Sequence, residues 1–189
     1  MIGLVGVGAV GVAAALLYKP FPPDRTPEGA YMRIARTVAD DTPALAFAYL
    51  ETEAQWACFS VRDARAKAAA RVAASYPDPQ RAELLAQYER FARAPDGADV
   101  FAIYYRERGW SRRLRKDLSG IARVEIEADR ASVVTARGSR YPFRRRDNGI
   151  WGLTIFTAEL EAEADRARKD LGIVEAAADD YDKLAKQRP

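Results

Sequence analysis

Residues 121–155, IARVEIEADRASVVTARGSRYPFRRRDNGIWGLTI, decide the fold class of this chain. Within this stretch β-branched and aromatic residues roughly alternate with polar ones, which is the period of a strand with one buried face. Turn-forming residues divide the stretch at Ala128-Asp129, at Gly138-Ser139 and at Asp147-Asn148-Gly149, and Asn-Gly is a strong hairpin signal. The sequence therefore predicts four antiparallel strands joined by tight turns.

The residues before this block carry helix start signals instead. Thr26-Pro27-Glu28 combines an N-cap residue, a proline at the first helical position and an early acid,. Thr42-Pro43 repeats the arrangement, and a longer helix is expected from Thr52 to about Ser75. Helices followed by an antiparallel meander make an α+β domain. On the long helix we expect these side chains to face inward: Trp56, Phe59 and Ala70.

A final long helix is expected over residues 158–189, starting from Thr157. Its apolar residues recur at alternating spacings of four and three, which makes a heptad seam. The seam can pack on the helix's own domain, or it can contact a second copy or a partner protein through residues 160–185. The sequence leaves both open. The seam residues are Leu160, Ala164, Ala167, Leu171, Val174, Ala178, Tyr181 and Ala185.

The N-terminal segment, residues 2–18 (IGLVGVGAVGVAAALLY), carries no charge. About 17 apolar residues lie at the short end of the range that spans a bilayer. We interpret residues 1–18 as a membrane anchor, with a cleaved signal peptide as the alternative, and residues 19–25 as a Pro-rich tether. Gly6 to Gly11 fits the G-x-G-x-x-G pattern, but no strand–helix alternation follows it, so a dinucleotide site is not expected.

Two observations disagree about the side of the membrane. Lys19, Arg25, Arg33 and Arg36 follow the segment, and the positive-inside rule would keep the following domain in the cytoplasm. A Pro-rich tether leading into a folded domain is instead typical of exported bacterial domains, and the Arg- and Ala-rich composition is typical of a GC-rich bacterial genome. We predict a single-pass protein of the bacterial inner membrane with a periplasmic domain, and keep the cytoplasmic side as the alternative.

Composition excludes several kinds of site. The chain has 189 residues, no His and one Cys, which rules out Ser-His and Cys-His nucleophile pairs and His-ligated metals. Cys58 cannot form an internal disulfide, and it lies in an apolar helical run where a buried, unreactive thiol is expected. We expect no metal and no other cofactor.

The charge is unevenly distributed. Residues 106–146 hold 13 Lys/Arg and 5 Asp/Glu, a net +8, although the whole chain carries only +3. Such a block could contact anionic lipid headgroups or an acidic protein. A nucleic-acid backbone is an alternative partner that we do not favour. The interpretation that needs no partner is a solvated surface whose cations pair with nearby acids. The residues predicted to contact an anionic partner are Arg112, Arg113, Arg115, Lys116, Arg144 and Arg146.

Several short motifs resemble the NTF2-like (cystatin-like) α+β superfamily, particularly its small secreted or membrane-tethered bacterial members of unknown function. Residues 26–30 (TPEGA) and 40–45 (DDTPAL) are similar to its first helix, acidic turn and second helix. Residues 129–134 (DRASVV), 141–143 (YPF) and 148–153 (NGIWGL) are similar to its closing meander. The resemblance covers residues 26–157.

The resemblance implies a curved sheet around a long helix, with a conical pocket. Some relatives bind small ligands there, and some are isomerases or dehydratases that use an Asp or His base. This chain has no His, and we match no Asp or Glu to that base. Tyr141, Phe143 and Arg145 share one strand face because alternate side chains point the same way. The candidate pocket residues are Tyr104, Tyr105, Trp110, Tyr141, Arg145 and Trp151.

From the sequence we therefore expect a membrane-tethered, non-catalytic binding or scaffolding module. It would contact membrane lipid through residues 2–18. The first alternative is a small-molecule carrier or an isomerase- or dehydratase-type enzyme that uses the pocket. The second is a nucleic-acid binder that uses residues 106–146.

Overall fold

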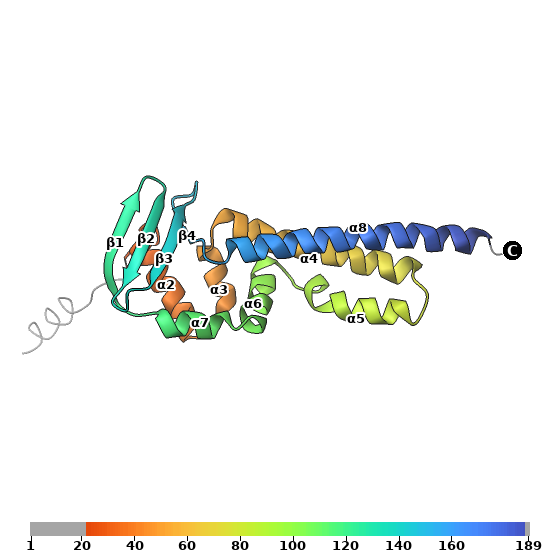
Figure 1. Ribbon diagram of the computed structural model, residues 1–189, viewed down its shortest axis with the longest axis horizontal. Coiled ribbons are helices and arrows are strands. Elements are labelled where there is room, and N and C mark those ends of the chain that lie inside the picture. Colours follow the sequence, from red (N-terminus) through yellow and green to blue (C-terminus); the bar gives the residue numbers. More distant parts are fainter. Residues whose placement is uncertain (1–21, 188–189) are drawn as a thin grey trace, which may run out of the picture.

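The structure is a computed structural model that describes residues 22–187. The molecule is elongated, with a head that contains the sheet and the short helices and an arm of longer helices that projects from it (Figure 1). Within the described residues, the search for a helix both long and apolar enough to cross a bilayer finds none. The predicted anchor, residues 1–18, and residues 19–21 of the predicted tether lie outside the described residues.

Five short helical elements build the head together with the sheet. They are α2 (Pro27–Ala39), α3 (Pro43–Ala46), the 3-10 helix η1 (Phe47–Tyr49), α6 (Gly97–Glu107) and α7 (Trp110–Asp117). The predicted cap at the start of α2 is confirmed, because the Thr26 hydroxyl accepts a hydrogen bond from the Gly29 amide at 3.1 Å. Asp96 caps α6 in the same way, accepting from the Ala98 and Asp99 amides.

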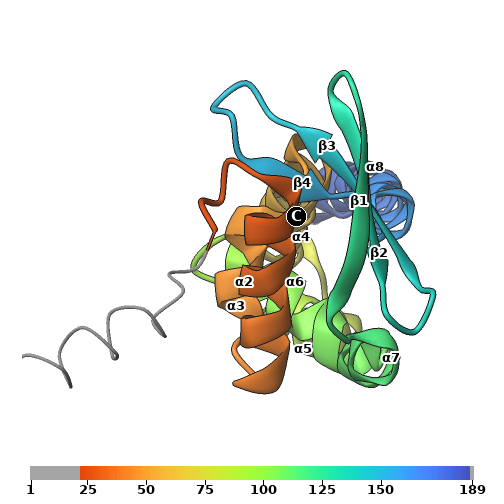
Figure 2. The same cartoon turned by 90° about the vertical axis from the view of Figure 1, so that its left-hand side faces the viewer.

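The predicted meander is confirmed. Strands β1 (Ile121–Glu127), β2 (Arg130–Thr135), β3 (Arg140–Arg145) and β4 (Trp151–Leu153) form one antiparallel sheet in the order β1-β2-β3-β4. Ala131 lies opposite Phe143, which lies opposite Leu153, so these three side chains form one buried row. The helix α2 packs beside this sheet (Figure 2), and the rings of Tyr31 and Tyr141 lie 5.3 Å apart at that contact.

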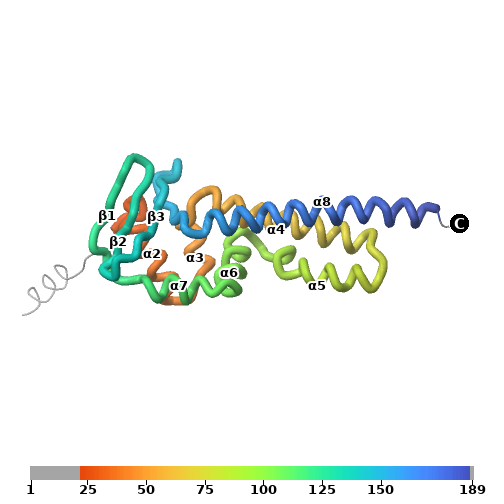
Figure 3. The backbone as a smooth tube through the Cα atoms, in the orientation of Figure 1, coloured from red at the N-terminus to blue at the C-terminus, as the bar shows by residue number. Residues whose placement is uncertain are grey.

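The arm is made of α4 (Thr52–Ser75), α5 (Gln80–Ala92) and α8 (Thr157–Gln187), and α4 and α8 run side by side along its length (Figure 3). The predicted ends of α4 are confirmed. The heptad seam of α8 exists and faces α4, so the seam packs within its own chain. Its buried residues are Leu160, Ala164, Ala167, Val174 and Ala178. A second apolar core within the arm joins α4, α5 and α8 around Tyr76 and Tyr88.

The predicted inward face of α4 was wrong. Trp56 is 66% exposed and Phe59 is 37% exposed, and Ala70 is exposed too. The residues that α4 buries are mostly small, because α5, α6 and α8 all pack against it, and helices approach closely only over small side chains. They are Ala54, Ala57, Cys58, Val61, Ala64, Ala68 and Val72.

Candidate functional site

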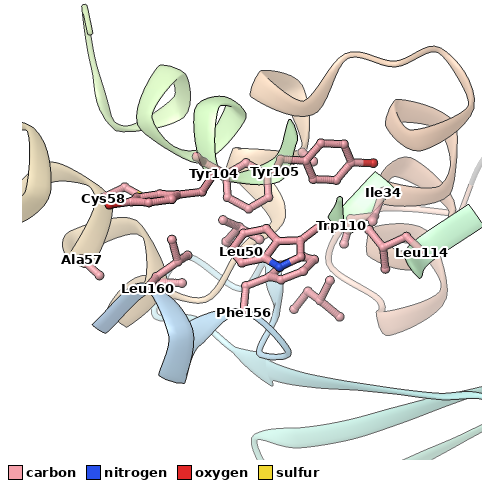
Figure 4. Close-up of a cluster of buried hydrophobic side chains, with 14 of the residues drawn as sticks. Ile34, Leu50, Ala57, Cys58, Tyr104, Tyr105, Trp110, Leu114, Phe156 and Leu160 are labelled. Carbon is pink, nitrogen blue, oxygen red and sulfur yellow. The ribbon is translucent and has the colours of Figure 1, made fainter. Parts of the chain in front are cut away.

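Five of the six candidate pocket residues, all except Arg145, belong to one buried hydrophobic core. Tyr104, Tyr105 and Trp110 come from α6 and α7 (Figure 4), and Phe101 of α6 packs against Tyr105, Trp110 and Phe156, the residue before α8. The Trp110 and Phe156 rings are stacked with their centroids 4.3 Å apart. The Tyr104 hydroxyl donates to Glu163 Oε2 at 3.3 Å. These side chains fill the space between α6, α7 and α8.

Tyr141 and Trp151 belong to the same buried core but contact other parts of the chain, whereas Arg145 lies outside the core. Tyr141 packs on Tyr31 under the sheet. Trp151 is buried, and its indole Nε1 donates to the Arg25 carbonyl at 3.1 Å, which fastens the start of the described chain to β4. Arg145 shares a sheet face with Tyr141, as expected, but it is exposed at the end of β3. The structure therefore packs five of the six residues into one buried core and leaves Arg145 at the surface.

The phenol groups of the candidate pocket residues Tyr104 and Tyr141 stay protonated in neutral solution. Burial raises the pKa of Tyr141 to about 12, with a smaller contribution from Tyr31. Burial also raises the pKa of Tyr104, and the carboxylate of Glu163 raises it further. A general base must carry a lone pair that is free near the working pH. These two tyrosines act as packed side chains and hydrogen-bond donors.

The α7 helix presents a basic surface, which we call the α7 basic face: Arg112, Arg113, Arg115 and Lys116. The helix is only eight residues long. Trp110 and Leu114, four residues apart, are both buried, and residues at this spacing share one face of a helix. The four cations around them are all exposed. Sequence reasoning included residues 110–117 in a helical insert from Tyr76 to Leu118 but did not identify α7 as a separate helix, although the Trp110–Leu114 spacing was the signal for one.

Few acids neutralise the α7 basic face. Arg113 lies 3.4 Å from Glu159, and Arg115 lies 3.8 Å from Asp41, all with exposed side chains. Such exposed pairs each contribute about 0–1 kcal/mol. Across residues 22–187, no ion pair is found for Arg112 or Lys116. The face therefore carries positive charge that is available to an anionic partner.

The remaining two predicted contact residues, Arg144 and Arg146, have structural partners. Arg144 lies 3.6 Å from both Glu51 and Glu53 at the start of α4. Arg146 donates to the Ala48 carbonyl at 2.9 Å and to Gln55 Oε1 at 3.0 Å. Both arginines tie the end of β3 to η1 and α4. They lie apart from the α7 basic face.

Glu51 is a buried carboxylate that sequence reasoning treated only as part of a helix start. It is 5% exposed, and the Thr157 hydroxyl donates to it. Burial raises the pKa of Glu51, and the Thr157 hydrogen bond partly offsets this rise. The residue links α4, β3 and α8. The close approach of β4 to this point requires Gly152, because an added Cβ would lie 2.5 Å from the Glu51 Cα atom.

Cys58 is fully buried, and burial raises the pKa of its thiol to about 12, as expected for an unreactive thiol. Among the described residues, no group of three or more His, Cys, Asp or Glu side chains could hold a metal ion. Comparison of the chain with protein-family models, with curated proteins and with solved structures finds no match.

Proposed function

We propose that this protein is a membrane-tethered, non-catalytic binding module, and that the α7 basic face contacts an anionic surface. The observation that carries the proposal is the geometry of α7. Two buried apolar side chains hold the helix against the head, and its four cations are exposed. With acids in residues 22–187, these cations form only two ion pairs, both long and exposed. We propose the anionic headgroups of the tethering membrane as that surface, because basic residues near such a membrane each contribute about 1 kcal/mol.

The tether itself is proposed from residues 2–18, which carry no charge over a length close to that of a membrane-spanning helix,. The protein would sit in the bacterial inner membrane with its domain in the periplasm. We also infer that the head is a variant of the NTF2-like cone. The order of its elements supports this, with α2 packed on a four-stranded meander.

A non-catalytic role is supported by how the candidate pocket residues are used. Trp110 stacks on Phe156, Tyr104 packs on Phe91 and Tyr105 packs on Phe101. Trp151 donates a hydrogen bond to the start of the described chain. Each of these contacts stabilises the fold. The function would therefore lie on the outer surface of the head and not inside it.

The test places a fluorophore beside the α7 basic face, at Ser111→Cys, in the full chain reconstituted into nanodiscs. The label is selective because Cys58 is fully buried. A quencher attached to lipid headgroups then reports contact. We expect stronger quenching in discs that contain phosphatidylglycerol than in phosphatidylcholine discs, and we expect high salt to remove the difference because salt screens exposed charges.

Two variants with the same loss of charge complete the test. The first, R112Q/R113Q/R115Q/K116Q, should lose the dependence on anionic lipid. The second, K67Q/K169Q/K183Q/K186Q, removes four exposed cations from the arm and should keep it. Equal quenching of the unsubstituted chain in both kinds of disc would contradict the proposal.

A further inference from the structure

An apolar hollow of about 460 Å³ opens on the outer side of α2. Its exposed wall is almost entirely apolar, and its size lies within the range of sites for small ligands,. Residues from two distant parts of the chain form it. The walls are Tyr31, Met32, Ala35 and Arg36 from α2, Ser119 and Gly120 from the segment that leads into β1, and Ile121 at the start of β1.

The polar groups that Tyr31 and the Ser119 backbone contribute to this wall are already hydrogen-bonded to each other. The Tyr31 hydroxyl donates to the Ser119 carbonyl at 2.7 Å and accepts from the Ser119 amide at 3.2 Å. A bound molecule would therefore gain binding free energy by burying apolar surface in the hollow, at about 25 cal/mol per Å². An unbranched hydrocarbon suits such a wall better than a polar metabolite.

Cations border the hollow where the chain leaves α7. The Ser119 hydroxyl accepts a hydrogen bond from the Arg137 amide at 3.2 Å, and the Arg137 guanidinium donates to the Lys116 carbonyl. Lys116 and Arg137 thus lie next to a wall residue, and Lys116 belongs to the α7 basic face. Arg36 contributes a further exposed cation, paired with Asp40 at 3.0 Å.

The start of the described chain lies on the same helix as the hollow. The Pro22 carbonyl accepts a hydrogen bond from Arg33 Nη1 at 2.7 Å, and Arg33 lies between Met32 and Ala35 in the sequence of α2. Only Lys19, Pro20 and Phe21 separate Pro22 from the uncharged segment that ends at Tyr18. Four residue steps span at most about 14 Å. A membrane that holds residues 2–18 would therefore lie close to α2.

We propose that this hollow binds an acyl chain of an anionic phospholipid from the tethering membrane, with Lys116 and Arg137 beside the headgroup phosphate. The apolar wall binds the hydrocarbon, and the bordering cations select the charge. This inference rests on the proposed membrane tether. It adds a defined lipid site to the general electrostatic contact of the α7 basic face.

The test uses the full chain in nanodiscs that contain phosphatidylglycerol with a photoreactive diazirine on its acyl chain. After irradiation, mass spectrometry locates the cross-linked peptides. We expect cross-links both in residues 2–18 and at the hollow, in residues 27–39 or 118–127. A phosphatidylcholine probe with the same acyl chain should give fewer cross-links at the hollow and as many in residues 2–18.

Two variants of α2 separate the hollow from simple surface contact. Ala35→Glu places a charge in the hollow, whereas Ala39→Glu places one at an exposed position of the same helix outside it. Only Ala35→Glu should remove the cross-links at the hollow, with those in residues 2–18 unchanged. Thermal unfolding establishes that both variants are folded.

The outcomes distinguish the two proposals. Cross-links confined to residues 2–18, or an equal effect of the two substitutions, would overturn the lipid site and leave the tether standing. The absence of cross-links in residues 2–18 would overturn the tether, and the lipid site would fall with it.

Discussion

The Trp110→Ala substitution distinguishes a packed aromatic core from a ligand pocket. Trp110 is 3% exposed and stacks on Phe156 at 4.3 Å. Truncation of a buried Trp to Ala costs about 3–5 kcal/mol, and loss of an aromatic pair adds about 0.5–1.5 kcal/mol in the general case. We therefore expect a loss of about 3.5–6.5 kcal/mol. At about 2–4 °C per kcal/mol for a domain of this size, the Tm should fall by roughly 7–26 °C.

The assay is urea and thermal unfolding followed by far-ultraviolet circular dichroism. Trp56→Ala is the matched control, because Trp56 is 66% exposed and a surface substitution changes stability by only about 0.5 kcal/mol. If Trp110→Ala unfolded at the same urea concentration as Trp56→Ala, the Trp110 side chain would not be part of a packed core. The aromatic cluster would then have to be reconsidered as a pocket lining.

Three further predictions concern buried residues. Because the pKa of Glu51 is raised above its usual 4.5, the folded chain binds that proton more tightly than the unfolded chain, so stability should fall as the pH rises from about 4.5 to the raised pKa. Urea midpoints across pH should show this fall weakened in Glu51→Gln and kept in Glu175→Gln, a substitution at an exposed position of α8. Cys58, with a pKa of about 12, should react with a thiol reagent only as fast as the protein unfolds, and rapid labelling of the native protein would contradict its burial. Leu160→Ala should cost about 2–5 kcal/mol in urea unfolding and the 69%-exposed Ile173→Ala no more than about 0.5 kcal/mol; similar costs would mean that the α8 seam does not face α4.

The elements that the sequence predicted best are those with local signals. Alternation and the Asn148-Gly149 turn define the sheet because both act within a few residues. The cap at Thr26 is equally local. The seam of α8 was visible for the same reason, but periodicity identifies a face and not what covers it. The partner is α4, more than 80 residues earlier in the chain, and nothing near α8 points to it.

The errors have a common physical cause. Trp56 and Phe59 were predicted to lie on the buried face of α4 because they are large and apolar. Burial in a helix follows the recurring face, and in α4 that face is made of small residues such as Ala57, Ala64 and Ala68. The dense packing of three helices on α4 leaves no room there for an aromatic ring, so the rings lie outside.

The predictions for the candidate site also failed where they depended on contacts between distant parts of the sequence. Strand alternation correctly put Arg145 on the face of Tyr141, but whether the end of a strand is covered depends on distant helices. Arg144 and Arg146 were grouped with the α7 cations by charge alone. Their partners, Glu51 and Gln55, lie about 90 residues away in the sequence, and composition cannot reveal such pairs.

The most direct test of the tethered, anion-binding module compares flotation of the full chain and of residues 22–189 with liposomes. The shorter chain keeps both apolar cores, which use residues 30–178. We predict that the full chain floats with neutral and with anionic liposomes, and that residues 22–189 float only with anionic liposomes and only at low salt. A full chain that stays unbound with both kinds of liposome would contradict the tether, and a shorter chain indifferent to lipid charge would contradict the role of the α7 basic face.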